Sequence, residues 1–273
     1  MLGRVVDVRM PRDWISRIQA VEYLRAFMMG RTGWSVLNSL LVISGAFGLF
    51  RRDVLVEAGG LDTTCIGEDA ELVVRLHRRM RDAKRPYRIV FVAEPVSWTE
   101  VPSTRAVLAR QRRRWARGLA EILWRHRSMI GNPRYGRIGL VALPYFVIFE
   151  LLAPIIELVG VVAVVAGLAL GAINLAFAAA FLLVAVLYAF VLSLAALTLE
   201  EIAFHRSARW SDLAVALGAA MLENLAFRQR TAVWRVQGTW AAMRGHSQEW
   251  GEMTRVGFGQ AAPHAELPQE TSL

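Results

Sequence analysis

Apolar positions recur with a helical period along the first part of the chain. Between residues 14 and 29 they return every three or four positions, at Ile15, Ile18, Val21, Leu24 and Met28. This spacing places them on one face of an amphipathic helix, which Gly30 and Gly33 are expected to end. Residues 51–58 form a second, shorter predicted helix, and Gly59-Gly60 behind it is a usual C-terminal signal.

A third helix is predicted from Glu68-Asp69 to Arg81, with Leu72, Leu76 and Met80 as its buried stripe. Acidic residues in a first turn are favoured by the helix macrodipole, so these two can be simple capping residues. The same position also keeps a carboxylate ionised, as a general base requires. Residues 86–93 predict a buried strand and residues 5–8 another, which makes this part of the chain α/β.

The pattern changes beyond residue 133, where the chain becomes apolar. There is no charged residue between Leu158 and Leu199, and about 20 apolar residues span a bilayer. We therefore expect two membrane helices, at about 143–170 and 174–199, and interpret a weaker segment at about 212–228 as interfacial or re-entrant. The predicted fold is an α/β domain (1–135) followed by an all-α transmembrane region (136–230) and a tail (231–273) that is first basic and then disordered.

Composition supports this division. The 273 residues are 55% hydrophobic with a formal charge of +9, and the mean hydropathy is +0.36. Positive charge beside membrane segments usually marks the cytoplasmic side. We expect an integral protein of the inner or plasma membrane that binds no nucleic acid. Cys65 is the only cysteine, which excludes an intrachain disulfide and a cysteine-based metal site.

A basic stretch, Gln111-Arg112-Arg113-Arg114-Trp115, lies just before the apolar part. On a helix, Gln111, Arg114 and Trp115 project from one face. Guanidinium groups suit phosphate oxygens, an indole suits a sugar ring, and an amide can donate and accept. Such a face could hold a phosphorylated sugar, and the alternative is a basic cluster held against anionic lipid.

The order of several short motifs resembles that of family 2 glycosyltransferases, specifically the membrane-embedded branch that includes cellulose, chitin and hyaluronan synthases. The motifs are Ser44-Gly45-Ala46-Phe47, Gly59-Gly60-Leu61-Asp62, Gly67-Glu68-Asp69, Thr99-Glu100-Val101-Pro102 and Gln111 to Trp115. The resemblance implies an α/β nucleotide-sugar domain at the cytoplasmic face. It also implies inverting transfer of a sugar from a nucleotide diphosphate to a saccharide or lipid-linked acceptor.

The same resemblance implies roles for individual residues. Asp69 would be the general base and Glu68 its neighbour in the same turn. The remaining expected substrate-binding residues are Gln111, Arg112, Arg114, Trp115, Gly45, Ala46, Phe47 and Glu100. The family also implies Mg²⁺ or Mn²⁺, which would stabilise charge on the departing diphosphate.

One expected part is missing. The chain has no Asp-x-Asp pair for a metal, so we expect the C-terminal portion of such an enzyme, without its donor-binding half or metal ligands. It would then be inactive alone or work with a separate chain that supplies that half. The alternative from another class is a non-catalytic membrane scaffold, or a small transporter whose pore is lined by Glu150 and Glu157.

Overall fold

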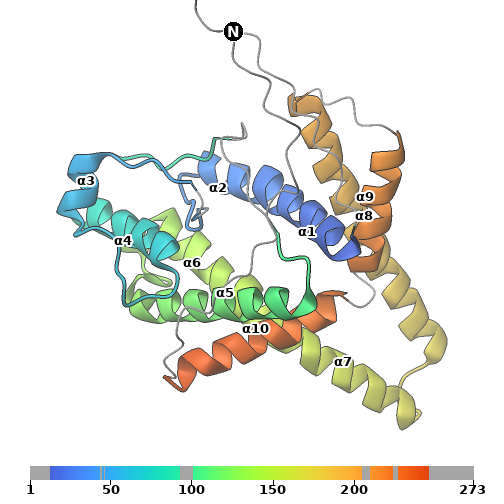
Figure 1. Ribbon diagram of the computed structural model, residues 1–273. Helices are drawn as coiled ribbons and strands as arrows, with labels where there is room; N and C mark the ends of the chain where they lie inside the picture. Colours follow the sequence, from blue (N-terminus) through green and yellow to red (C-terminus); the bar gives the residue numbers. More distant parts are fainter. Residues whose placement is uncertain are drawn as a thin grey trace, which may run out of the picture.

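The computed structural model describes residues 13–43, 45, 47–92, 101–204, 210–223 and 227–245, and helices dominate them. Figure 1 shows α5 and α10 side by side, with α4 and α1 above α5 in this view, and the turn end of the α7–α8 hairpin projecting at the lower right. The first part comprises α1 (Trp14–Leu24), the π-helix η1 (Arg25–Arg31), α2 (Thr32–Val36), α3 (Arg52–Glu57), α4 (Glu68–Asp82) and α5 (Arg105–Arg125).

The second part begins with the short 3-10 helices η2 (Arg127–Met129) and η3 (Pro133–Tyr135). It continues through η4 (Ile138–Ala142), α6 (Leu143–Tyr145), η5 (Phe146–Leu152), α7 (Ala153–Ala169), α8 (Leu175–Phe204), α9 (Trp210–Leu222) and α10 (Arg228–Met243). The helices predicted at residues 51–58 and 68–81 are confirmed as α3 and α4. The predicted stop at Gly30 and Gly33 is wrong, because the chain stays helical to Val36. A helical glycine costs only about 1 kcal/mol, which packing can offset.

The expected α/β class is also wrong, because the described residues contain no strand. Residues 86–92 are extended, but their backbone pairs with side chains. Phe91 N donates to Ser35 Oγ (2.8 Å), and Ile89 N donates to Asn38 Oδ1 (3.1 Å). A strand needs a neighbouring backbone to form its ladder, and this segment has two side chains in its place. The strand predicted at residues 5–8 lies outside the described residues.

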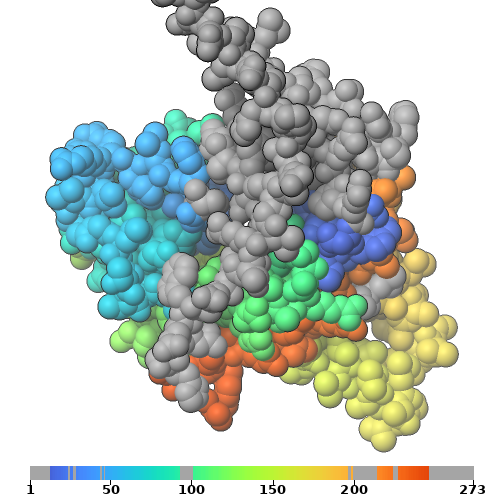
Figure 2. Space-filling model, in the orientation of Figure 1, coloured from blue at the N-terminus to red at the C-terminus, as the bar shows by residue number. Residues whose placement is uncertain are grey.

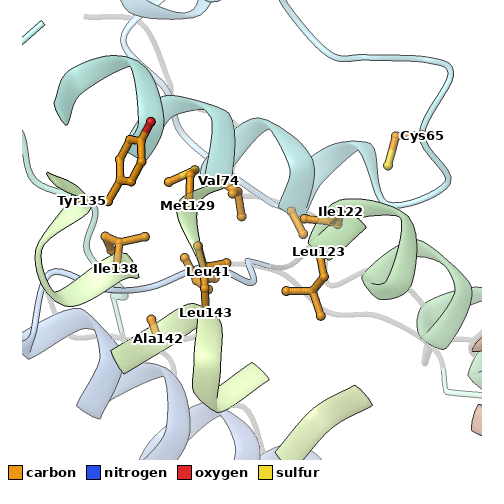
Figure 3. Packing of buried hydrophobic residues seen from close by; sticks show 11 residues of the cluster. Leu41, Cys65, Val74, Ile122, Leu123, Met129, Tyr135, Ile138, Ala142 and Leu143 are labelled. Atoms are coloured by element: carbon orange, nitrogen blue, oxygen red, sulfur yellow. The ribbon is translucent and has the colours of Figure 1, made fainter. Parts of the chain in front are cut away.

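The main apolar core joins α4, α5 and the turn that leads into η4. Figure 3 shows Val74 of α4 and Ile122 and Leu123 of α5 facing Leu41 and Leu143. Met129, Tyr135 and Ile138 close the same cluster. Because α4 and α5 share this core, the first turn of α4 is held in a fixed position relative to α5.

Two helices are long and apolar enough to cross a membrane. They run over Ile138–Ala169 and Leu175–Ala195, with mean hydropathies of 2.5 and 2.8. Their surfaces are almost entirely exposed, and Figure 2 shows the yellow hairpin projecting from the rest of the molecule. By contrast, α9 has 13 residues, fewer than the roughly 20 that span a bilayer. It packs Ala216, Ala219 and Ala220 against Ile18 and Val21 of α1.

The helix α10 joins the two parts of the molecule. Its Gly238 lies against the backbone of α5, where an added Cβ would be 2.9 Å from Arg113 Cα. Two arginines of α10 pair with the other part of the molecule. Arg228 Nε pairs with Glu157 of α7 (3.1 Å), and Arg235 Nη2 pairs with Glu150 of η5 (2.8 Å). Each glutamate on which the transporter interpretation rested therefore has an arginine of α10 as its ion-pair partner.

Candidate active site

The turn Glu68-Asp69 begins α4 and is held directly on α5. An added Cβ on Gly118 would lie 3.1 Å from Gly67 N, so two glycines let the backbones touch. The loop before α4 is tied to α5 by Ile66 N, which donates to Glu121 Oε2 (3.3 Å), and by the pair of Asp62 with Arg125. Gly118 lies about one turn after Arg114 and Trp115 and two turns after Gln111, on the same face of α5. The acidic turn and the basic motif therefore meet at one surface.

A second segment approaches the same turn from residues 43–47. An added Cβ on Gly45 would lie 2.9 Å from Asp69 Oδ2, so only a glycine leaves this carboxylate accessible beside the backbone. Phe47 is exposed close by in the sequence. Two predicted site residues, Gly45 and Asp69, are thus brought together, while Ser44, Ala46 and Glu100 lie outside the described residues.

The residues of the basic motif have different surroundings. Gln111 and Arg112 are buried, whereas the Trp115 side chain is 44% exposed and available to a ligand. Arg112 forms a two-pronged ion pair with Glu22 of α1, and its Cζ lies 5.0 Å from the centre of the Trp115 ring. The predicted basic helix is confirmed, but Arg112 is engaged by α1 rather than open to solvent.

Two residues that the sequence did not single out complete this surface. Tyr23 of α1 lies 6.3 Å from Trp115 between ring centres, and Arg31 at the end of η1 donates to Ile43 O (3.5 Å). Burial lowers the pKa of Arg31 to about 10, while the Asp69 carboxylate and Tyr23 act in the opposite direction. Burial raises the pKa of Tyr23, which nearby Arg112 partly opposes. Tyr23 lies within the amphipathic helix predicted at residues 14–29, and Arg31 lies between the two glycines expected to end it, so no motif marked either residue.

Comparison with known proteins identifies the family of the chain. The model of glycosyl transferase family group 2 matches residues 2–192, well over half of the chain. The chain belongs to this family. Its relatives include the poly-beta-1,6-N-acetyl-D-glucosamine synthases of Staphylococcus aureus and Staphylococcus epidermidis, each 32% identical over 118 residues. That match covers 43% of this chain and 27% of each synthase. No solved structure matches the chain.

Behind this surface, a buried charged network fixes α4. Glu71 accepts from Arg75 Nε (3.1 Å) and lies 3.2 Å from His126 Nε2 at the end of α5. Burial raises the pKa of Glu71, but the hydrogen bonds from His126 and Arg75 outweigh it, and the net pKa is lowered. The Glu71 carboxylate is therefore charged at neutral pH and links α4 to α5 two residues beyond Asp69.

The loop that leads into α5 is held by α1. Gln19 is buried, and its Nε2 donates to Pro102 O at 2.7 Å. Thr104 then caps α5 by accepting from Val107 N. The loop between Val101 and α5 is thus fixed to the same helix that carries Glu22 and Tyr23.

Divalent metals are common in this family, but the described residues do not fit one with their own side chains. No group of three or more His, Cys, Asp or Glu side chains converges within the described ranges. Asp53, Asp62 and Asp82 are each paired with an arginine, whereas Mg²⁺ prefers converging carboxylate oxygens.

Proposed function

We propose that the chain takes part in transfer of a sugar from a nucleotide-diphosphate sugar to an acceptor hydroxyl at a membrane, with Asp69 as the general base. The observation that carries the proposal is the contact of Gly67 with Gly118, which sets the first turn of α4 on the α5 face of Gln111, Arg114 and Trp115. Family membership supports the reaction class.

The chemistry assigned to Asp69 follows from its position. A sugar hydroxyl ionises far above neutral pH, so its attack requires a carboxylate at hydrogen-bond distance to take the proton. The N-terminus of α4 favours negative charge, and the backbone at Gly45 leaves room beside Asp69 Oδ2. Arg31 lies close enough to interact electrostatically with Asp69, so it would orient the carboxylate before the proton moves.

Acceptor and donor would bind to the exposed face of α5. The half-exposed indole of Trp115 offers a flat apolar surface to a sugar ring. Arg114, directly before Trp115 in the chain, would contribute positive charge at the place where the diphosphate departs. The names of the relatives suggest N-acetylglucosamine as the sugar and a β-1,6-linked polymer as the acceptor.

We place the reaction at the cytoplasmic side of a bilayer that α7 and α8 cross. Residues up to 135 would form the catalytic part and residues 136–230 the membrane region. The exposed apolar surfaces of both helices support this arrangement. The sequence of α10 carries Arg228, Arg230 and Arg235 close behind the apolar region, and positive charge beside membrane segments usually marks the cytoplasmic side.

The test uses the full chain in membrane vesicles with Mg²⁺ or Mn²⁺ and UDP-N-acetylglucosamine. Transfer to a β-1,6-linked N-acetylglucosamine oligomer and release of UDP are both measured. Asp69→Asn should lower turnover by about 10²- to 10⁴-fold, the usual contribution of a general base. Trp115→Ala should mainly raise the acceptor KM.

Asp53→Asn is the matched control, because this carboxylate is exposed on α3 and pairs with Arg51. It should leave turnover unchanged. The proposal is contradicted if the vesicles show no transfer, or if turnover survives both Asp69→Asn and Trp115→Ala.

A further inference from the structure

The strongest polar contact between α1 and α5 is the pair of Glu22 and Arg112. Arg112 Nη1 donates to Glu22 Oε1 at 2.7 Å, and Nη2 donates to Oε2 at 2.6 Å. The Arg112 side chain is 7% exposed. A two-pronged pair fixes the plane of the guanidinium as well as its position. Both terminal nitrogens of Arg112 are thus engaged by Glu22.

The fixed guanidinium in turn contacts the indole proposed to bind the acceptor. Its Cζ lies 5.0 Å from the Trp115 ring centre, within the range of a cation–π contact. Tyr23, next to Glu22, contacts the same indole at 6.3 Å between ring centres and hydrogen-bonds Gln111. Two adjacent residues of α1 therefore act on Trp115, Tyr23 by direct contact and Glu22 through Arg112, and the residue stays 44% exposed.

The position of α1 is itself well determined. Its apolar face packs against α9, and Arg25, at the start of η1, donates to Ser193 of α8 (3.1 Å) and pairs with Glu223 at the end of α9. Glu22 and Tyr23 therefore project from a helix held on one side by α8 and α9. Any displacement of α1 would be passed through Arg112 to Trp115.

We propose that Glu22 is a positioning residue, which orients the Trp115 indole for the acceptor sugar by holding Arg112. This inference rests on the proposed function. Glu22 touches neither substrate nor reacting atoms, and Arg112 acts between it and the indole. Removing the Glu22 charge leaves a buried guanidinium without its partner, so Arg112 and the ring above it must shift.

The kinetic test compares Glu22→Gln, Arg112→Met and their double variant in the vesicle assay. Glu22→Gln should raise the acceptor KM by at least tenfold, with up to about 100-fold for a displacement near 1 Å, while kcat changes much less. Because both residues act through one contact, the double variant should be no worse than Arg112→Met alone. Additive effects, or a loss confined to kcat, overturn the proposal.

Glu57→Gln is the matched control. Glu57 also pairs with an arginine through both carboxylate oxygens, which accept from Nη1 of Arg85, but both side chains are exposed, on α3 and on the loop after α4. This change removes the same charge far from Trp115 in the sequence and should leave the acceptor KM unchanged. An equal rise in KM for the control overturns the proposal.

A spectroscopic readout separates this inference from the proposed function. The protein is labelled with 5-fluorotryptophan, and the Trp115 resonance is assigned by its loss in Trp115→Phe. Glu22→Gln should move this ¹⁹F resonance and leave that of Trp34, which packs on Tyr145. Arg112→Lys is a second variant for the case that Glu22→Gln disturbs all resonances. It keeps the positive charge but loses the two-nitrogen contact of the guanidinium, and it should move the Trp115 resonance alone. An unmoved Trp115 resonance overturns the proposal even if transfer occurs, and a moved one sustains it even if no transfer is found.

Discussion

Charged side chains are placed in opposite ways in the α4–α5 region and in the α7–α8 hairpin. Around α4 and α5 several are buried, including Glu71, Arg112 and Arg117. Along the hairpin the last charged residue before the long neutral run is Glu157, which α10 pairs with Arg228. One region keeps charge inside, and the other excludes it.

The difference follows from the surroundings that each region requires. A buried carboxylate is tolerated when more than one donor reaches it, and Glu71 has both Arg75 and His126. The hairpin pairs Glu157 with a single arginine at its base and otherwise exposes apolar side chains on nearly all sides. The first region thus completes its contacts within the chain, whereas the second depends on lipid to cover it.

The first prediction compares a glycine-to-alanine substitution in α10, which packs on α5, with one in the hairpin helix α7. Gly238→Ala in α10 places a methyl group 2.9 Å from Arg113 Cα and closer still to its carbonyl oxygen. Because both contacts are backbone, α10 must move away from α5. We expect a loss of about 3 kcal/mol, the upper end for overpacking, measured by denaturation in detergent.

Gly160→Ala in α7 is the control, since nothing lies within 4 Å of an added Cβ. It should be neutral or stabilising by up to about 1 kcal/mol, because alanine is the better helix former. Equal losses for both variants would show that α10 does not contact α5 as described.

The second prediction concerns acid sensitivity, which the buried polar groups should confer. His77 Nε2 donates to Leu40 O (2.9 Å), and Nδ1 accepts from the Tyr87 hydroxyl (2.8 Å). Burial lowers the pKa of His77 to about 4, against an opposing contribution from the Leu40 hydrogen bond. The histidine pKa in the unfolded chain is about 6.5. Between pH 6.5 and 4, His77 is therefore protonated in the unfolded chain and neutral in the folded chain.

The contribution of His77 to the free energy of unfolding is therefore fully present above pH 6.5 and is lost as the pH falls toward 4. At pH 5 the loss should be about 2 kcal/mol. Denaturation in detergent between pH 7.5 and 5 measures it, and His77→Gln should abolish this slope while lowering stability at pH 7.5. A wild-type stability that is constant over this interval would show that His77 is not held neutral.

Local pattern was enough to predict the helices that carry the motifs. The acidic first turn of α4, its stripe of Leu72, Leu76 and Met80, and the glycines after α3 are all local signals, and the structure has them there. The proximity of Gly45 to Asp69 was expected only from motif order. The helix signals depend on residues within one or two turns of one another, whereas Gly45 and Asp69 are brought together by the fold.

The remaining features depend on partners distant in the sequence. The run Ile89 to Val92 has strand composition, yet a strand needs a second backbone, and here Ser35 and Asn38 supply side chains. Glu22 meets Arg112 across 90 positions, and no spacing rule connects an amphipathic helix to a basic one. The contact of Gly238 with Arg113 spans a still longer separation and has no local signal either.

The smallest predicted effect lies at the boundary between the two regions, where α10 pairs with the start of the hairpin. Arg235 contacts both the Glu150 carboxylate (2.8 Å) and the Glu150 carbonyl oxygen. Pro154, four residues on, has no N–H to donate to that carbonyl. Arg235→Gln should therefore cost about 1–2 kcal/mol, the penalty for an unsatisfied acceptor.

Arg228→Gln removes a pair whose arginine is 58% exposed and should cost less than about 1 kcal/mol, with a loss that shrinks in high salt. Both are measured by denaturation in detergent at low and high salt. If the two variants lose equal stability at both salt concentrations, Arg235 does not replace the hydrogen bond that Pro154 removes, and the boundary is held by charge alone.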